Sequence, residues 1–422
     1  MSMSEHKLCE IGEAASRQDE KGQHFRVTVG ELQLGAKERE YLDAVIRSNR
    51  LSYGPWTQKF EADFARMHDS RYAVFCNSGT SALHIAVAAL KELHGWKDGD
   101  EVIVPSVTFV ATVNVVLHNG LKPVFVDVSP LTYNLDPNLL EAKITPRTRA
   151  VLPVHLLGLP ADMKPIADIA QRYGLRIIED SCETMFARYQ GRSVGAWGDI
   201  GCFSTYIAHY IVTGVGGFAT TNNPDLAVML KSLMNHGRDS IYLSIDDDDT
   251  NNPEQLFEIV ARRFRFTHLG HSFRCTEMEA AIGLAQLESK DAIVAKRKGI
   301  AKCYLNRLAP YQDFLQLPTI PPDRDHVFML FPIVLRDGNK RDLVNHLESH
   351  GVETRDLLPL LNQPVYQKMF GNLEPQYPVA EWLNRCGFYI GCHQYLTEAS
   401  VDHVAEIIGS FVNSQRGQKL AA

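Results

Sequence analysis

The chain has 422 residues, of which 45% are hydrophobic and 22% are charged. This composition is typical of a globular protein with a large core, and the length predicts two or three domains. The formal net charge of −7 disfavours nucleic acid and anionic membrane surfaces as partners. No apolar run is long enough to form a membrane-spanning helix.

Residues 1–30 are predicted to form a polar N-terminal tail. The part from Met1 to Arg26 has no apolar stretch of the secretory kind, which indicates a cytoplasmic protein. Eight cysteines are scattered along the chain without a CxxC pair. They are therefore predicted to be reduced thiols, and neither a disulfide framework nor a metal site is expected.

Short apolar strands alternate with amphipathic helical stretches from Tyr72 to Asn222, which is the pattern of a βαβ architecture. Most of the strands are runs of Val and Ile, which favours a mostly parallel sheet buried on both faces. Helices are predicted at Thr80–Leu93 and Ala161–Tyr173. Residues 31–290 are assigned to this large domain, with strands at Tyr72–Cys76, Glu101–Val104, Pro123–Asp127, Ala150–Val154, Arg176–Glu179, Gly201–Ser204 and Gly217–Thr221.

The pattern changes after about Ser289. A charged helix at Asp291–Leu308 leads into a proline-rich segment. After it the sequence predicts, in order, a strand, a helix, a strand and a closing helix at Met329–Leu335, Lys340–His350, Val352–Arg355 and Glu398–Val412. This order predicts a smaller C-terminal α+β domain over residues 291–416.

Three predicted strands are followed by residues suited to binding a ligand. The segment Asn77-Ser-Gly-Thr-Ser81 opens a helix, so it forms either a phosphate seat or an ordinary helix cap. Asp180 ends an apolar strand, where it would either hold a pyridine nitrogen protonated or cap the next segment. Phe109 follows another strand, where it would either stack on a flat ring or belong to the core.

The segment Ser204–Gly217 has the layout of an attachment loop for pyridoxal 5′-phosphate (PLP). A hydroxyl lies five residues before the reactive position, and a glycine cluster starts five residues after it. That position holds His209 instead of the lysine that forms a Schiff base with the cofactor aldehyde. Imidazole cannot form this stable imine, but it exchanges protons near neutral pH. The sequence therefore predicts a non-covalently held cofactor and a histidine base.

In this order, these residues resemble the sugar aminotransferases of the DegT/DnrJ/EryC1/StrS family, which are fold-type I PLP proteins. The resemblance covers the chain from about Leu51 onward and rests on a series of short motifs. They include Leu51-Ser-Tyr-Gly-Pro55, Ser78-Gly-Thr-Ser-Ala-Leu83, Val104-Pro-Ser-Val-Thr-Phe109, Glu179-Asp180, Asn235-His-Gly237 and Ala280-Ala-Ile-Gly-Leu-Ala-Gln-Leu287. It implies an α/β fold with a mostly parallel seven-stranded sheet in the large domain.

The resemblance also implies roles for the matching positions. Gly79, Thr80 and Ser204 would bind the cofactor phosphate. Phe109 would stack on the cofactor ring, and Asp180 would pair with the ring nitrogen.

The family is typically homodimeric, with active sites at the subunit interface. A partner-chain residue often completes the phosphate site from the loop that is Gly270–Arg274 here. The asparagine common in that loop is replaced by Ser272, which puts this contact in question.

Two positions depart from the aminotransferase pattern. His209 replaces the lysine, and Glu183 stands where aminotransferases commonly carry glutamine. The same pair marks the nucleotide-sugar 3-dehydratases, such as GDP-4-keto-6-deoxy-D-mannose 3-dehydratase. The resemblance then implies that pyridoxamine 5′-phosphate, formed with glutamate as amino donor, condenses with a nucleotide-linked 4-keto sugar. His209 would remove a proton, and the C3 hydroxyl would leave.

Arg274 and Arg355 are candidates for binding the nucleotide diphosphate, because guanidinium suits phosphate oxygens. The alternative for each arginine is a surface salt bridge.

Two other functions stay open. A nucleotide-sugar aminotransferase would use another lysine or free pyridoxamine phosphate, again with glutamate as donor. A non-catalytic family member is favoured by Ser272 and by Val215, which replaces the usual acid in the glycine cluster. Thr80, Asp180 and Ser204 favour a working cofactor site.

Overall fold

The computed structural model describes residues 26–421, apart from 242, 244–246, 337 and the side chains of 417–421. Most of the predicted polar tail therefore lies outside the described residues. The last residues of that segment are part of the fold, because Val27 is buried and bridges Val352 of the C-terminal region.

The larger sheet has seven strands in the order β1-β9-β8-β5-β4-β2-β3. Strands β8, β5, β4, β2 and β3 pair in parallel, whereas β9 runs antiparallel to both of its neighbours. The predicted strands and the mostly parallel sheet are confirmed. Their bounds are β1 Tyr72–Cys76, β2 Glu101–Pro105, β3 Lys122–Val126, β4 Thr148–Val151, β5 Arg176–Asp180, β8 Ile200–Ser204 and β9 Gly217–Thr221.

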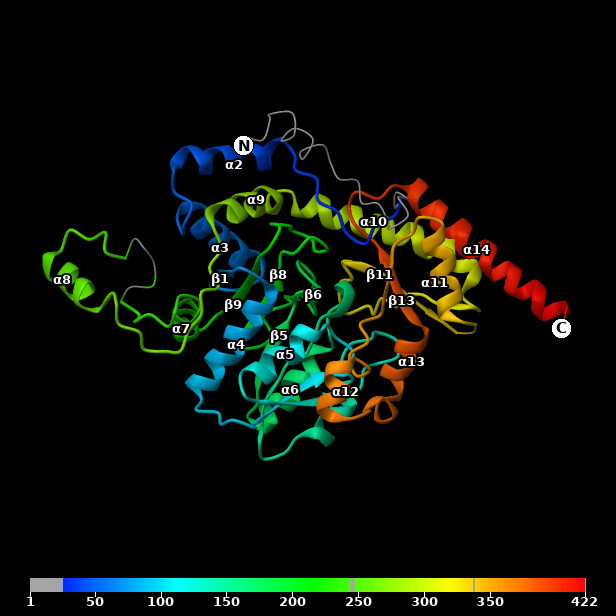
Figure 1. Cartoon of the computed structure of the whole chain (residues 1–422), viewed down its shortest axis with the longest axis horizontal. Coiled ribbons are helices and arrows are strands. Elements are labelled where there is room, and N and C mark those ends of the chain that lie inside the picture. The colour runs from blue at the N-terminus through cyan, green and yellow to red at the C-terminus, as the bar shows by residue number, and fades with distance from the viewer. Residues whose placement is uncertain (1–25, 242, 244–246, 337, 422) are drawn as a thin grey trace, which may run out of the picture.

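Both faces of this sheet are buried, which explains the continuous Val and Ile runs. In β2, Val102 and Val104 face a core that also contains side chains of α4 and α5, whereas Ile103 faces a second core beside α6. Figure 1 shows the helices around the strands. They are α2 Ala36–Ser48, α3 Pro55–Met67, α4 Gly79–Leu93, α5 Val110–His118, α6 Met163–Tyr173, α7 Pro224–Met234 and α9 Glu277–Leu287. A two-stranded ribbon, β6 Arg188–Tyr189 with β7 Arg192–Ser193, joins β5 to β8.

The smaller sheet is antiparallel, with the order β10-β11-β13-β12. Its strands β10 Leu315–Gln316, β11 Leu330–Leu335, β12 Thr354–Asp356 and β13 Gly387–Gly391 are accompanied by α10 Lys290–Leu308, α11 Lys340–Ser349, α12 Pro364–Phe370, α13 Pro378–Cys386 and α14 Glu398–Ala421. Apolar residues of α10, α11 and α14 share one hydrophobic core with this sheet. The strand predicted from Val352 begins two residues later, at Thr354.

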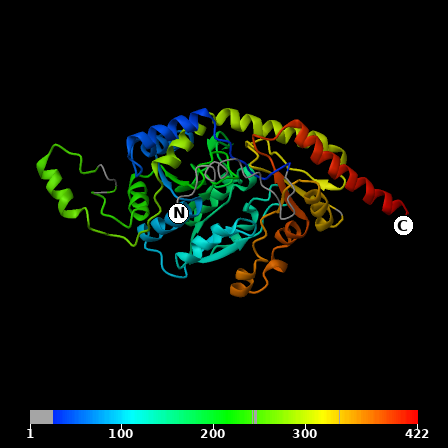
Figure 2. The same ribbon diagram turned by 45° about the horizontal axis from the view of Figure 1, so that its top comes forward.

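An arm between α7 and α9 carries α8, Pro253–Arg262, and projects from the body of the molecule in both views (Figures 1 and 2). Several of its large apolar side chains are exposed, with Phe257 at 70%, Phe264 at 76% and Leu269 at 94%. None of the helices in the described part of the chain is both long and apolar enough to cross a membrane.

Candidate active site

A cavity of about 460 Å³ lies at the carboxyl ends of β1, β2, β5 and β8, beside the smaller sheet. Such a crevice is where open α/β sheets bind ligands. The structure brings seven of the predicted site residues together in its lining. They are Gly79, Thr80, Phe109, Asp180, Glu183, Ser204 and His209.

The first turn of α4 forms one wall of the cavity. The Ser78 hydroxyl accepts a hydrogen bond from the Ser81 N–H at 3.0 Å and caps the helix. A Cβ atom on Gly79 would lie 2.7 Å from Ser204 Cβ and 2.8 Å from Cys182 Sγ. Only glycine therefore lets the helix approach Ser204 so closely. The free N–H groups and the positive end of the helix dipole make this turn suited to a phosphate group.

Asp180 lies at the end of β5 and is buried. One carboxylate oxygen accepts a hydrogen bond from the Thr112 hydroxyl at 2.8 Å, and the other accepts one from the Cys182 N–H at 3.1 Å. Burial raises the pKa of Asp180. Among the described residues, no lysine or arginine is one of the charges that act on this carboxylate. The site therefore has a buried acid that suits a cationic N–H group of a ligand.

Phe109 lies in the loop between β2 and α5, and 57% of its side chain is exposed. This exposure excludes the interpretation as a core aromatic. The side chain lines the same cavity as Asp180, so one face of a flat ligand has an aromatic surface available.

His209 is buried in the loop that follows β8. Its Nδ1 lies 3.0 Å from the carbonyl oxygen of Tyr206. Because a carbonyl oxygen only accepts hydrogen bonds, Nδ1 carries the hydrogen of the neutral ring and Nε2 has a free lone pair. Burial lowers the pKa of His209 to about 4, against the opposing effect of the Tyr206 hydrogen bond. The imidazole is therefore a neutral base at physiological pH.

The loop around His209 is held at both ends. Thr205 and Thr213 share a hydrogen bond between their hydroxyls at 2.6 Å, and the Thr213 N–H donates to the Thr205 carbonyl at 3.0 Å. Gly216 has a φ of +150°, and a Cβ atom there would lie 2.4 Å from the Thr205 hydroxyl. The glycine cluster thus allows a closed loop. Val215 is half exposed at the rim of the cavity.

Glu183 is the second carboxyl group of the cavity. One of its oxygens accepts a hydrogen bond from the Leu157 N–H at 2.9 Å. Burial raises the pKa of Glu183 to about 7, so both protonation states are populated near neutral pH. The cavity therefore has a neutral imidazole, a buried carboxylate and a carboxyl group that can donate or accept a hydrogen bond.

Residues 32–409 match the DegT/DnrJ/EryC1/StrS aminotransferase family. The chain belongs to this family. GDP-perosamine synthase of Caulobacter vibrioides is 36% identical over 384 residues, which cover 90% of this chain and 96% of that protein. The family resemblance predicted from the sequence is thereby confirmed.

Two solved structures represent two kinds of relative. S. venezuelae DesV shares 33% identity and a TM-score of 0.78 over 89% of this chain and 94% of its own. GDP-4-keto-6-deoxy-D-mannose-3-dehydratase of E. coli, with bound hydrated PLP, shares 26% identity and a TM-score of 0.82 over 91% of this chain and 99% of its own. The fold-type I architecture is thus confirmed, whereas the choice between transamination and dehydration is not decided by similarity.

Two further residues contribute to the site but were not identified from the sequence. Thr112 contacts Asp180 from α5, and Tyr389 lines the cavity from β13. Thr112 follows Thr108 by four residues, about one helical turn, and their hydroxyls are 2.8 Å apart, so the spacing of two hydroxyls on either side of Phe109 was a usable signal. Tyr389 comes 185 residues after Ser204, the nearest predicted site residue in the large sheet, and no local pattern points to it.

The two predicted substrate-binding arginines do not line this cavity. Arg274 borders a separate cavity of about 860 Å³ beside Ser272, and its guanidinium lies 3.2 Å from the Ser272 hydroxyl. Arg355 is on β12, where it pairs with Glu353. Arg355 therefore forms the salt bridge that was the alternative to substrate binding. Diphosphate binding by Arg274 stays a prediction.

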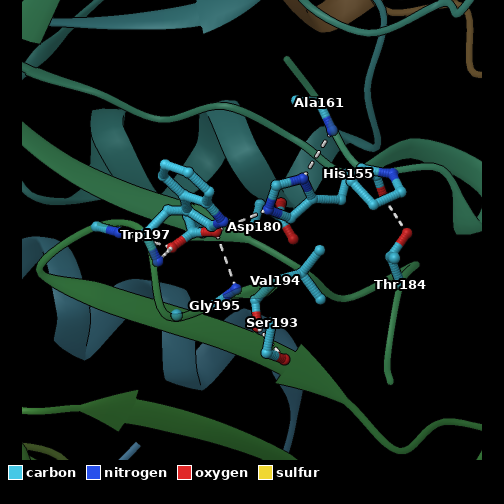
Figure 3. Close-up of polar contacts among 12 residues, drawn as sticks. His155, Ala161, Asp180, Thr184, Ser193, Val194, Gly195 and Trp197 are labelled. Atoms are coloured by element: carbon cyan, nitrogen blue, oxygen red, sulfur yellow. Dashed lines mark hydrogen bonds and ion pairs between the residues drawn. The ribbon is translucent and has the colours of Figure 1, made fainter. Parts of the chain in front are cut away.

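A buried hydrogen-bond network surrounds Glu179, the residue before Asp180 in β5 (Figure 3). The Glu179 carboxylate accepts hydrogen bonds from the N–H groups of Gly195, Trp197 and Gly198 at 2.6–2.8 Å. It also accepts one at 2.9 Å from Nε2 of His155, whose Nδ1 accepts a hydrogen bond from the Ala161 N–H. Because both ring nitrogens are occupied, His155 is structural.

Proposed function

We propose that the protein is a PLP- and pyridoxamine-phosphate-dependent 3-dehydratase of a nucleotide-linked 4-keto-6-deoxy sugar. The observation that carries this proposal is the environment of His209. This residue lies in the cavity with Nδ1 bonded to the chain and Nε2 free, at the position where the family's attachment loop would present a lysine.

The cavity residues fit the cofactor. Gly79, Thr80 and Ser204 would hold the phosphate, since the glycine leaves the helix turn close to Ser204. Phe109 would cover one face of the ring. Asp180 would hold the ring nitrogen protonated, because a buried carboxylate without a cationic side chain gains most from such a partner. When bound, the cofactor supplies an amine for the sugar ketone and a ring that accepts electrons.

His209 would then act as base and acid in turn. Its neutral Nε2 would remove a proton from the carbon that joins the cofactor to the amine nitrogen. The resulting imidazolium could then give a proton to the departing C3 hydroxyl. The Tyr206 carbonyl keeps Nδ1–H fixed during both steps, so the ring does not rotate. Replacing lysine also removes the internal amine that favours transamination.

Glu183 would adjust the polar groups of the bound cofactor or sugar. Near neutral pH its carboxyl group exists in both protonation states, so it can donate or accept a hydrogen bond inside the cavity. Glutamine can also do both, but it cannot release a proton.

Transamination is the second candidate function. The relatives named GDP-perosamine synthase in Caulobacter vibrioides and in E. coli O157:H7, which are aminotransferases, support it. In that case glutamate would supply nitrogen that stays on the sugar, and His209 would move the proton that a lysine moves elsewhere in the family.

We also propose that the protein acts as a homodimer in which Arg274 of one chain helps to bind the substrate diphosphate in the other. The exposed Phe257, Phe264 and Leu269 of the arm support an additional contact surface of this kind.

Product analysis tests the function. The purified protein is incubated with PLP, glutamate and a panel of 4-keto-6-deoxy nucleotide sugars, and the products are analysed by mass spectrometry. A 3-deoxy sugar without added nitrogen supports dehydration, an amino sugar supports transamination, and unchanged substrates across the panel would contradict both. The matched variant His209→Asn is expected to lower turnover by about 10²- to 10⁴-fold.

Borohydride trapping tests the mode of cofactor binding. We expect no covalent cofactor on the native chain, and a covalent adduct on His209→Lys. An adduct on another lysine of the native chain would contradict the role of His209.

A further inference from the structure

Arg297 is a buried arginine behind the cavity. It lies in the middle of α10, and only 1% of its surface is exposed. Within the described part of the chain it pairs with no carboxylate. Its guanidinium instead lies 4.8 Å from the Tyr210 ring centre and donates to four neutral acceptors. A buried charge without a counter-ion is costly, so this arrangement calls for an explanation.

The four acceptors belong to three segments of the chain, around His209, Met329 and Cys392–Gln394. One guanidinium nitrogen donates to the carbonyl oxygen of His209 at 2.9 Å. A second donates to the carbonyl of Met329 at 2.9 Å and approaches that of Cys392 at 3.4 Å. The third donates to the Gln394 side chain at 3.1 Å. Arg297 thereby joins the His209 loop to the segments that enter β11 and leave β13.

These contacts position the main chain of the base itself. The imidazole of His209 is fixed on one side by the Tyr206 carbonyl, and the carbonyl of His209 is fixed by Arg297. Met329, another acceptor, lines the cavity opposite the large sheet. We propose that Arg297 is a positioning residue that fixes the main chain of His209 and adds a permanent positive charge behind its imidazole. The expected effect on turnover rests on the proposed function, whereas the expected effect on the titration of His209 does not.

The charges around the imidazole support this assignment. The ionisable groups that share its cavity are Asp180, Cys182 and Glu183 at the end of β5, Tyr206 in its own loop and Tyr389 on β13. Of the charged side chains, Arg297 is the one whose field lowers the pKa of His209, in addition to the larger effect of burial. Arginine keeps its charge even where burial lowers its pKa, so the effect persists at all working pH values.

The test compares two substitutions that separate charge from geometry. Arg297→Met removes the charge but keeps much of the side-chain volume, whereas Arg297→Lys keeps a charge but loses the planar fork that reaches several acceptors. The matched control is Arg324→Met. Arg324 is also a buried arginine over a tyrosine ring, but it pairs with Asp323 and makes no contact with His209.

The first readout is the titration of His209, followed by NMR in protein with labelled histidine side chains and assigned with His209→Asn. It is measured without cofactor or substrate. In Arg297→Met we expect the midpoint to rise by roughly half a pH unit, which is less than the shift that burial causes, while Arg297→Lys and Arg324→Met stay close to the native value. An unchanged midpoint in Arg297→Met, or an equal shift in Arg324→Met, overturns the inference.

The second readout is the pH profile of turnover, with whichever product the enzyme forms. Arg297→Met should move the acid limb to higher pH, whereas Arg297→Lys should lower kcat about tenfold or more without moving that limb. If Arg297→Met does not fold, native kcat in Arg297→Lys overturns the inference. An amino-sugar product would refute dehydration but leave the titration result valid, so the two failures are distinguishable.

Discussion

Two buried histidines have different tasks because of what their ring nitrogens contact. His155 donates from Nε2 to Glu179 and accepts at Nδ1 from the Ala161 N–H, which leaves no lone pair free. His209 donates from Nδ1 to the Tyr206 carbonyl, and the described residues offer Nε2 no partner. The contrast follows from hydrogen bonding rather than from burial, because both side chains are buried.

Gly79 gives the sharpest single-residue prediction. In Gly79→Ala the new methyl group would lie 2.7 Å from Ser204 Cβ, so the first turn of α4 must move away from its neighbour. We expect PLP affinity to fall at least about tenfold, which corresponds to the loss of one or two hydrogen bonds to a charged group. Spectroscopic titration with PLP measures this affinity.

Gly299→Ala is the matched control for this substitution. Gly299 is exposed within α10, and its added Cβ would meet nothing within 4 Å. We expect unchanged PLP affinity and a stability gain of up to about 1 kcal/mol, because alanine favours a helix interior. Native affinity in Gly79→Ala would contradict the phosphate seat.

At the scale of elements, one carboxylate joins β5 to the turn before β8. Glu179 receives four hydrogen bonds, three of them from the backbone between Gly195 and Gly198. Glu179→Ala would leave these donors unpaired in the core. We expect the free energy of unfolding, measured by urea titration, to fall by about 3–5 kcal/mol.

The control for Glu179→Ala is Lys164→Ala on α6. The Lys164–Asp168 pair is exposed on both sides, so its loss should leave the unfolding midpoint nearly unchanged. Equal effects of the two substitutions would show that the Glu179 network stabilises the fold no more than an exposed ion pair does.

At the scale of the whole molecule, buried histidines predict acid sensitivity. Burial lowers the pKa values of four of them to about 4 or, for one, about 3: His68, His209, His393 and His326. The unfolded chain binds protons at these groups near pH 6.5, so it holds more protons than the folded chain below that pH. The contribution of these histidines to the free energy of unfolding is therefore fully present above pH 6.5 and is lost as the pH falls toward 4.

The predicted slope is about 1.4 kcal/mol per pH unit for each such proton. Glu183 offsets part of it, because its raised pKa lets the folded chain bind one extra proton between about pH 4.5 and 7. Urea unfolding at several pH values between 7.5 and 5 measures the net slope. His209→Asn should reduce it by about one proton, and equal stability at pH 7 and pH 5 would disprove this prediction.

The proposed homodimer is also a property of the whole molecule. Sedimentation equilibrium is expected to give twice the mass of one chain. Phe264→Ser would weaken the association if the arm contributes to the contact, because the arm exposes this ring at 76%. A monomer at micromolar concentration with full activity would contradict a site shared between chains.

Much of the fold was predictable because both faces of the large sheet are buried. Burial on both faces requires continuous apolar strands, and such runs can be recognised in a sequence without knowing their partners. The site residues at strand ends were predictable for a related reason, because the carboxyl ends of parallel strands meet at one edge. Asp180, Ser204 and His209 are examples.

The sequence by itself thus determined the strands, the family and the absence of lysine at position 209. Only the tertiary structure decided which nitrogen of His209 is free, that Arg297 holds its main chain, and that Arg355 lies outside the cavity. The contacts of His209 with Tyr206 and of Arg355 with Glu353 are local, but their geometry is set by the fold around them. The Arg297 contact joins residues 88 apart along the chain. No local pattern records such contacts, because they exist only after the two sheets pack around the cavity.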